Sequence, residues 1–485
     1  MVKPSQPPRA GLVLAVLSVA AFMASLDVFI VNVAFDSIGA DFPGTSLSQL
    51  SWVLNAYAVV FAALLVPAGR LADRYGRRAG FVLGLAVFTL ASAACAASDG
   101  IWELVAFRAV QAVGAALLTP ASLGLVLASS APEHRARSVK IWAASGAVAA
   151  ALGPVFGGLL VEASWRWVFL VNVPVGVLAI VGALRWAPRS RDESVTTLPD
   201  LLGAALLAAG VGVFSLGLVK GPDWGWTAGR TDLTWAVTAL SLVLFVAQSR
   251  RHPSPVVSAG LLKVRTFAWS NATALLFAIA FAASLLSVVL YLQQVWGYSP
   301  IRTGLAVAPG PMMVPVVAAL AHRLAARVPV GVVVSAGCLA LGGGALLIAT
   351  SVGREPSYAS TLLPGWLIGG AGVGLALPAI LSAATADLPA ADAATGSGVI
   401  SMNRQIGTAI GVSLIVAILG TPVDYAAAHT AFRHSWWTLA AVTVLAAVAA
   451  LGMTPRRAAP SAVGPDERVA VPEDVVGVDA ALDRQ

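Results

Sequence analysis

Long apolar stretches alternate with short polar segments along most of the chain. Each stretch is long enough to cross a bilayer as a helix, which takes about 20 residues. To within a few residues at each end, the fourteen stretches are 12–34, 50–69, 79–98, 102–127, 140–161, 167–186, 200–219, 232–248, 268–292, 303–321, 329–350, 359–383, 396–419 and 436–453. The pattern predicts an all-α polytopic membrane protein with 14 transmembrane helices.

Two internal repeats divide these spans into two groups. Arg-Leu-Ala-Asp-Arg at 70–74 follows the second span, and Arg-Leu-Ala-Ala-Arg at 323–327 follows the tenth. The fourth and twelfth spans share a second pattern, formed by Gly114, Pro120, Ala121 and Leu123 in one and by Gly372, Pro378, Ala379 and Leu381 in the other. The repeats predict two six-helix bundles with a pseudo-two-fold relation and two inserted helices, an organisation typical of transporters.

The predicted organisation therefore has five parts. They are a cytoplasmic N-terminal tail (1–11), an N-terminal six-helix bundle (12–186), a linker with the two inserted helices (187–267), a C-terminal six-helix bundle (268–453) and a cytoplasmic tail (454–485). The last part mixes Pro, Ala, Val and charged residues without a helical period, which predicts disorder.

Composition and charge agree with a membrane protein. Hydrophobic residues make up 58% of the chain and charged residues only 11%, with a mean hydropathy of +0.84. A soluble domain has about 25% charged residues, so a soluble multidomain enzyme is disfavoured. The net charge of +7 comes from basic residues on alternate polar segments. The positive-inside rule then places both termini in the cytoplasm, with the chain in the cytoplasmic membrane.

An arginine-rich turn follows the second span. Residues 69–78 read Gly-Arg-Leu-Ala-Asp-Arg-Tyr-Gly-Arg-Arg. A positive-inside anchor would explain the arginines, but not the glycine spacing or Asp73. The turn resembles the cytoplasmic signature of the major facilitator superfamily, Gly-x-x-x-Asp-Arg/Lys-x-Gly-Arg-Arg/Lys, at every fixed position. The resemblance implies a cytoplasmic gate formed by Gly69, Asp73, Arg74, Gly76, Arg77 and Arg78.

Asp27 lies inside the first span, where a charged side chain costs about 2.5–3.5 kcal/mol on insertion scales. It is a candidate proton carrier; the alternative is a carboxylate near the helix end that snorkels or bonds to a neighbour. Residues 26–36 resemble the first-span signature of the fourteen-span drug:proton antiporters, Leu-Asp-x-Thr-Val-Val-Asn-Val-Ala-Leu-Pro, with Phe29 in place of Thr and Phe35-Asp36 in place of Leu-Pro. The resemblance implies proton coupling by Asp27 and a cavity position for Asn32.

Arg108 and Gln111 lie three residues apart in the fourth span, so both can face one cavity. A guanidinium stays charged and needs a partner or water there. A purely structural ion pair is the alternative to a functional role. Residues 108–115 resemble the family's Arg-x-x-Gln-Gly-x-Gly-Ala motif, with Ala112 in place of the first Gly. The resemblance implies that Arg108 takes part in proton transfer and that Gln111 lies in the cavity.

Two further segments resemble motifs of the same family. Small residues that permit close helix packing lie in the fifth span and resemble the antiporter signature Gly-Pro-x-x-Gly-Gly; they are Gly153, Pro154, Gly157 and Gly158. At the opening of the thirteenth span, Arg404 and Gln405 resemble an Arg-Gln-x-Gly motif. Arg404 either contacts substrate or anchors the helix near the cytoplasmic face.

The leading hypothesis is export of hydrophobic drugs or antibiotics by alternating access, driven by inward proton flow. One alternative is a dedicated exporter of a single endogenous metabolite, antibiotic or lipid, and another is a non-transporting membrane sensor or scaffold. An enzyme is disfavoured, because the sequence has no nucleophile–base pair or metal-ligand spacing. The expected partners are a small hydrophobic substrate, protons and membrane lipid. No nucleic acid, metal or cofactor is expected, and the chain is expected to function as a monomer.

Overall fold

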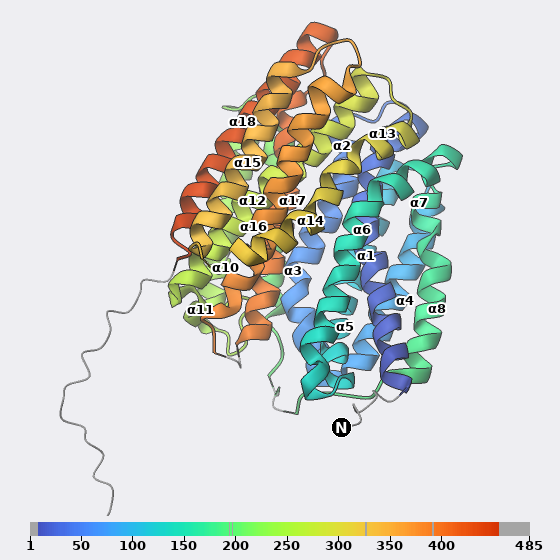
Figure 1. Cartoon of the computed structure of the whole chain (residues 1–485), viewed down its shortest axis with the longest axis vertical. Coiled ribbons are helices and arrows are strands. Elements are labelled where there is room, and N and C mark those ends of the chain that lie inside the picture. Colours follow the sequence, from blue (N-terminus) through green and yellow to red (C-terminus); the bar gives the residue numbers. More distant parts are fainter. Residues whose placement is uncertain (1–7, 194, 196, 325–326, 390–391, 455–485) are drawn as a thin grey trace, which may run out of the picture. The chain divides into compact units, whose positions relative to one another are not determined.

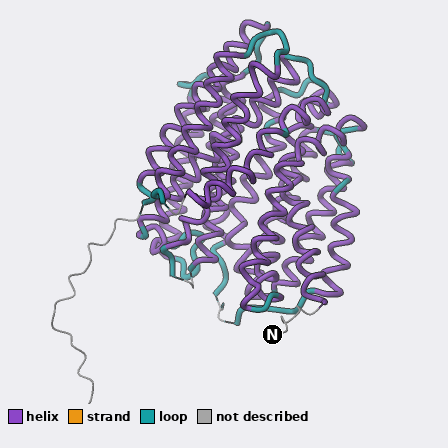
Figure 2. The backbone as a smooth tube through the Cα atoms, viewed as in Figure 1, coloured by secondary structure: helices purple, strands orange, loops and turns teal. Residues whose placement is uncertain are grey.

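The computed structural model describes residues 8–454, except 194, 196, 325–326 and 390–391. Within this part the chain is helical, without strands (Figure 2). Fourteen of its helical segments are long and apolar enough to cross a membrane, which confirms the predicted fold class. The predicted disordered tail lies outside the described residues, apart from Thr454. The centre of the second arginine repeat, at 325–326, also lies outside them.

The first six spans form the N-terminal half. Their elements are α1 (Pro8–Asp41), α2 (Leu47–Leu50), α3 (Trp52–Tyr75), α4 (Arg77–Ala96), α5 (Ile101–Ser129), η1 (Pro132–His134), α6 (Arg135–Ala163), α7 (Trp167–Leu170) and α8 (Asn172–Trp186). The short α2 begins with a capping box, in which the side chains of Ser46 and Gln49 satisfy each other's backbone N–H groups.

The two inserted helices are α9 (Leu201–Trp224) and α10 (Gly229–Arg251), followed by the short α11 (Ala259–Lys263). Asp200 caps α9, because its carboxylate accepts a hydrogen bond of 2.7 Å from the Gly203 amide. Leu207 and Val211 of α9 pack against α3 and α17. By contrast, α10 packs mainly on α9 and exposes Val243. The insertion is therefore attached to the rest of the molecule chiefly through α9.

The last six spans form the C-terminal half (Figure 1). Their elements are α12 (Arg265–Leu290), η2 (Tyr291–Val295), α13 (Pro300–Val307), α14 (Pro309–Leu324), α15 (Val330–Ser351), η3 (Tyr358–Leu362), α16 (Leu363–Ala386), α17 (Ala393–Leu419) and α18 (Tyr425–Leu451).

A glycine contact between corresponding helices is present in each half and relates the two. In the N-terminal half, a Cβ added at Gly84 of α4 would lie 2.8 Å from the carbonyl oxygen of Gly114 in α5. In the C-terminal half, a Cβ added at Gly337 of α15 would lie 2.7 Å from the carbonyl oxygen of Gly372 in α16. Both helix pairs need glycine at this point, since their backbones touch. The third and fourth spans thus pack like the eleventh and twelfth.

The two halves meet closely on one side of the bundle. We call the side on which α1 begins the N-side and the opposite one the far side. On the far side, Gln293 donates to the Val33 carbonyl at 3.0 Å, and Gln294 donates to Asp36 at 3.3 Å. Gly158 of α6 also lies against Pro300 of α13. These contacts join the two halves on the far side.

The N-side half of α6 is much less covered than its far-side half. Its first half buries only Ser138 and, near the middle, Ala149. Its far-side half buries a continuous small-residue face that includes Gly153, Gly157 and Val161. The interface between the halves is therefore tight toward the far side and loose toward the N-side.

Candidate functional site

Asp27 lies near the middle of α1 and is completely buried. The alternative is wrong in placing the carboxylate near the helix end, because α1 extends 14 residues further, to Asp41. Its other part, a hydrogen bond to a neighbour, is confirmed by the contacts of Asp27. A carboxylate at this depth must find its partners within the protein.

Three side chains from two other helices bind the Asp27 carboxylate. Arg108 of α5 forms an ion pair with Oδ2 at 2.6 Å, with both side chains buried. Gln111 of α5 and Asn172 of α8 donate amide hydrogen bonds to Oδ1, at 2.9 and 3.1 Å. Together with Ser92 of α4, which accepts from Gln111 at 2.7 Å, these residues form what we call the Asp27 cluster.

Arg108 also connects the cluster to α3. Its Nε donates to the Val53 carbonyl at 3.1 Å, and its guanidinium lies 4.2 Å from the centre of the Tyr57 ring. Its NH1 also donates to Gln111 Oε1 at 2.5 Å. The arginine thus bridges α1, α3 and α5, and a change of charge on Asp27 would be felt by all three helices.

The three-residue spacing of Arg108 and Gln111 predicts a shared cavity, whereas the structure places both in a closed, buried cluster. Ser92, Tyr57 and Asn172 were not among the predicted site residues. Asn172 is the first residue of α8. The run from Trp165 to Gly176 that contains it has few other polar residues. That lone amide at the start of a span was the available signal.

Asn32 does not belong to the Asp27 cluster. It is buried on α1, and its side-chain amide donates to the Val28 carbonyl of its own helix at 2.8 Å. This local bond satisfies one of the two N–H donors of the amide without a ligand.

Arg404 and Gln405 lie in the interior of α17 rather than at its opening. Both side chains are partly exposed. Next to them, Asn403 donates to Asn271 of α12 at 2.9 Å. The structure therefore separates Arg404 from the helix end at which an anchoring residue would lie.

The arginine-rich turn forms the junction between α3 and α4. Gly76 has φ of 120°, which favours glycine. Asp73 pairs with Arg77 at 2.6 Å, and its carbonyl accepts from the Asp192 amide at 2.8 Å. Arg70 binds Ser254 and Arg78 binds the Leu184 carbonyl. These two arginines and Arg77 thus bind groups of the protein, which a positive-inside anchor alone would not require.

The residues of the antiporter signature lie at helix contacts. A Cβ at Gly153 would meet Phe29 of α1 at 2.5 Å, and one at Gly157 would meet the backbone of Ile30 at 3.1 Å. One at Gly158 would meet the Pro300 carbonyl of α13 at 2.6 Å. The small-residue face of α6 therefore packs on the α1 segment next to Asp27 and on the opposite half.

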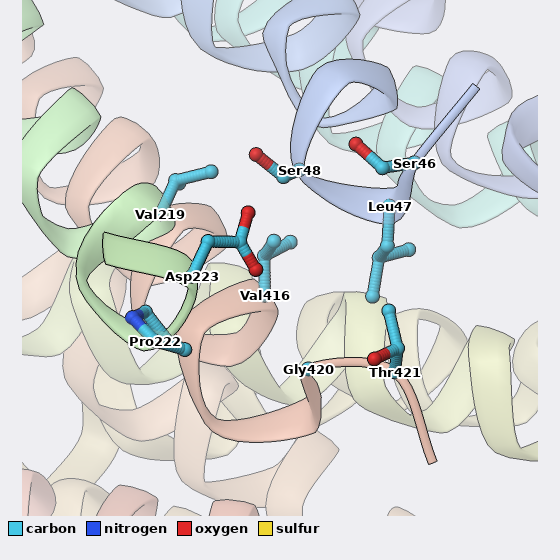
Figure 3. Close-up of a pocket in the computed structure, with 9 residues that line it drawn as sticks. All are labelled: Ser46, Leu47, Ser48, Val219, Pro222, Asp223, Val416, Gly420 and Thr421. Atoms are coloured by element: carbon cyan, nitrogen blue, oxygen red, sulfur yellow. The ribbon is translucent and has the colours of Figure 1, made fainter. Parts of the chain in front are cut away.

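A small pocket on the far side lies between α2, α9 and α17. It is lined by Ser46, Leu47, Ser48, Val219, Pro222, Asp223, Val416, Gly420 and Thr421 (Figure 3). Asp223 is already paired with Lys220 at 3.0 Å. No member of the Asp27 cluster lines this pocket, so we do not assign it to the site.

Known proteins similar to this chain are membrane transporters. The Major Facilitator Superfamily model matches residues 17–412. The chain is 33% identical over 420 residues to the methylenomycin A resistance protein of Streptomyces coelicolor, covering 86% of this chain and 87% of the relative. It is 34% identical over 401 residues to multidrug resistance protein Stp of Mycobacterium tuberculosis, with coverages of 82% and 74%.

The fold also matches solved transporter structures. A bacterial homologue of the human lysosomal transporter Spinster, solved in an inward-facing and unoccupied conformation, aligns with a TM-score of 0.64. The alignment covers 94% of this chain and 100% of that chain at 17% sequence identity. At this identity the likeness concerns the fold alone.

Proposed function

The chain belongs to the major facilitator superfamily and is a multi-pass membrane transporter rather than an enzyme, and we propose that it exports hydrophobic small molecules in exchange for protons. The relatives named above are resistance proteins, which supports export rather than uptake. We place the protein in the cytoplasmic membrane with its N-side toward the cytoplasm, since the arginine-rich turn lies on that side.

The buried Asp27–Arg108 pair carries this proposal. A buried ion pair stabilises a fold weakly, because desolvation offsets much of the attraction. Its position in the middle of a span, with two amides and a hydroxyl arranged around it, suits a group that gains and loses a proton. Protonation would remove the charge of Asp27 and release Arg108 from its strongest partner.

The same pair offers a route from protonation to conformational change. Arg108 holds Val53 and Tyr57 of α3, and α3 packs along α17 of the C-terminal half. Asn55 of α3 also donates to Ser413 of α17 at 3.0 Å. A proton on Asp27 therefore changes the energy of the helix that joins the halves. Such a differential energy is what a ligand needs to shift the equilibrium between inward-open and outward-open states.

Asp73 would act at the cytoplasmic gate rather than on substrate. It is ion-paired with Arg77 at the turn between α3 and α4. The gate would open and close as the two six-helix halves rock about the central site.

A dedicated exporter of one antibiotic is the second candidate function. The methylenomycin A resistance protein is named for a single compound, whereas the Stp protein is named for multidrug resistance. The two are almost equally similar to this chain, so both substrate ranges deserve a test. A sensor or scaffold without transport would not need a charged pair at the centre of a span.

Inside-out vesicles with an acidic interior and a pH dye test the proposal. We expect a panel of lipophilic antibiotics and dyes, added singly, to trigger proton release from wild-type vesicles and not from Asp27→Asn vesicles. Asp232→Asn is the matched control, because Asp232 is an exposed acid of the inserted helix α10, away from the contacts between the halves; it should release protons like the wild type. Release from Asp27→Asn at the wild-type rate would move proton coupling to another residue.

A further inference from the structure

The Arg404 guanidinium has no partner in the described part of the chain. No hydrogen bond, ion pair or ring contact of this side chain is present there, although its backbone carbonyl accepts from Thr408 at 3.0 Å. Arg108, by contrast, is a fully buried arginine that has an ion pair, three hydrogen-bond partners and two rings around it. Arg404 thus has a full positive charge and five unused N–H donors.

Arg404 lies too deep to reach the membrane surface easily. It is 11 residues from the start of α17 and 15 from its end, or about 16 and 22 Å at 1.5 Å per residue. Among the charged residues of the described spans, only Asp27 and Arg404 lie three helical turns or more from both ends. An arginine facing lipid at such depth costs several kcal/mol, so its charge needs a polar or anionic environment.

The faces of α17 show where this side chain points. Met402 and Ile406 belong to the cluster that packs against α3, and Gly407 lies against the backbone of α12. At 100° per residue, a face formed by Ser401, Thr408 and Val412 lies between these two contacts. Arg404 borders this face on the α12 side, and Gln405 borders it on the α3 side, where Gly398, one heptad earlier, meets Val66 of α3.

Exposure along that face changes at the level of Arg404. Ser401, Gln405 and Thr408 are partly exposed, whereas Val412 and Leu419, further toward the far side, are buried. The face is therefore closed on the far side and accessible on the N-side. Arg404 lies in the accessible part, on a helix that joins the two halves, which is where transporters of this architecture bind substrate.

No acid at similar depth balances this charge. Asp27 is the only acid of comparable depth in the described spans, and it is already neutralised by Arg108 in the other half. The site around Arg404 therefore carries a net positive charge. It repels cations and attracts an anionic group, more strongly than in water because the dielectric constant is lower.

We propose that Arg404 binds an acidic oxygen of the substrate, so that the exported compounds are lipophilic anions such as carboxylates. The guanidinium presents parallel N–H donors that match a carboxylate, and the Gln405 amide borders the same face as a further donor. This inference rests on the proposed export function and specifies its substrate class.

Binding to purified protein in lipid nanodiscs tests this inference. The probes are 1-pyrenebutyrate and its neutral analogue 1-pyrenebutyramide, detected by energy transfer from the protein's tryptophans, with empty nanodiscs as background. We expect wild type to bind the carboxylate about tenfold or more tightly than the amide, as for a hydrogen bond to a charged group. Arg404→Gln should remove this preference and keep the amide affinity. Arg404→Lys should retain part of the preference, since lysine keeps the charge without the planar fork.

The matched control is Arg433→Gln, which neutralises an exposed arginine of α18 and should preserve the preference for the carboxylate. The inference is overturned if wild type has no such preference, or if Arg404→Gln weakens carboxylate and amide binding by the same factor. The measurement uses no proton gradient. If wild type prefers the carboxylate but no compound triggers proton release from the vesicles, proton-coupled export is contradicted and anion binding by Arg404 still stands.

Discussion

Asp27 and Arg108 neutralise each other where neither has access to solvent. Removing one partner leaves an uncompensated buried charge or unsatisfied donors, at a cost of about 3–5 kcal/mol. We therefore expect Asp27→Asn to lower the thermal unfolding midpoint clearly, and Arg108→Gln to lower it as well. The double variant Asp27→Asn/Arg108→Gln should recover much of the loss, because no charge then remains. Tryptophan fluorescence during heating of the purified protein measures this, and strictly additive losses would argue against direct coupling.

At the scale of single residues, the sequence predicted the charged members of the site but not its neutral ones. Asp27 and Arg108 stand out because charge within a span is costly. Ser92 and Asn172 do not, since buried hydroxyls such as Ser122 and Thr443 bond to carbonyls of their own helices. Only the packing of α4, α5 and α8 around α1 shows which polar side chains meet the carboxylate.

At the scale of helices, the contact between α6 and α13 requires a residue without a side chain at Gly304. A Cβ at Gly304 of α13 would collide with the Pro154 carbonyl of α6. We expect Gly304→Ala to push the two helices apart, to destabilise the protein by about 1–3 kcal/mol as in overpacked cores, and to slow transport. Thermal unfolding and the vesicle assay report the two effects.

Gly343 of α15 is the control for this substitution, because a Cβ there meets no atom within 4 Å. Gly343→Ala should leave transport unchanged and stabilise the helix by up to about 0.5–1 kcal/mol. Equal effects of the two alanines would mean that helix propensity, and not the contact between the halves, sets the outcome.

Hydropathy located each of the fourteen candidate membrane-spanning helices in the described residues but misjudged some of their ends. The first span was predicted to end at residue 34, whereas α1 continues to Asp41. Its last turn is held by Arg166, paired with Asp41 at 2.5 Å, and by Trp165, which donates to the same carboxylate at 2.8 Å. Likewise α17 begins at Ala393, which places Arg404 well inside the helix. In α1, a polar residue bound by tertiary partners thus extends the helix beyond what hydropathy indicates.

At the scale of the whole molecule, the sequence predicted two bundles but not which side of them is closed. The glycine pairs of α4–α5 and α15–α16 are local features of each half, and one glycine of each pair, Gly114 or Gly372, also belongs to the sequence repeat. The contacts between the halves must break and form during a transport cycle, and one sequence encodes both states. Closure of the far side, through contacts such as Gln293 to Val33, is therefore visible only in the structure.

Locking the far-side contact should stop the cycle. Asp36 and Gln294 are exposed, lie in different halves and are joined by a hydrogen bond of 3.3 Å. We expect a short bifunctional thiol reagent to link Asp36→Cys to Gln294→Cys and to abolish transport, with recovery after reduction. The native Cys95 and Cys338 are buried and should not compete for the reagent.

The matched control is the pair Asp41→Cys with Arg166→Cys, whose parent residues are ion-paired on the same side but within one half. Its link should leave transport intact, because rigid-body rocking does not separate these positions. Continued transport by the linked Asp36/Gln294 variant would mean that the far side need not open, and alternating access between these two halves would have to be abandoned.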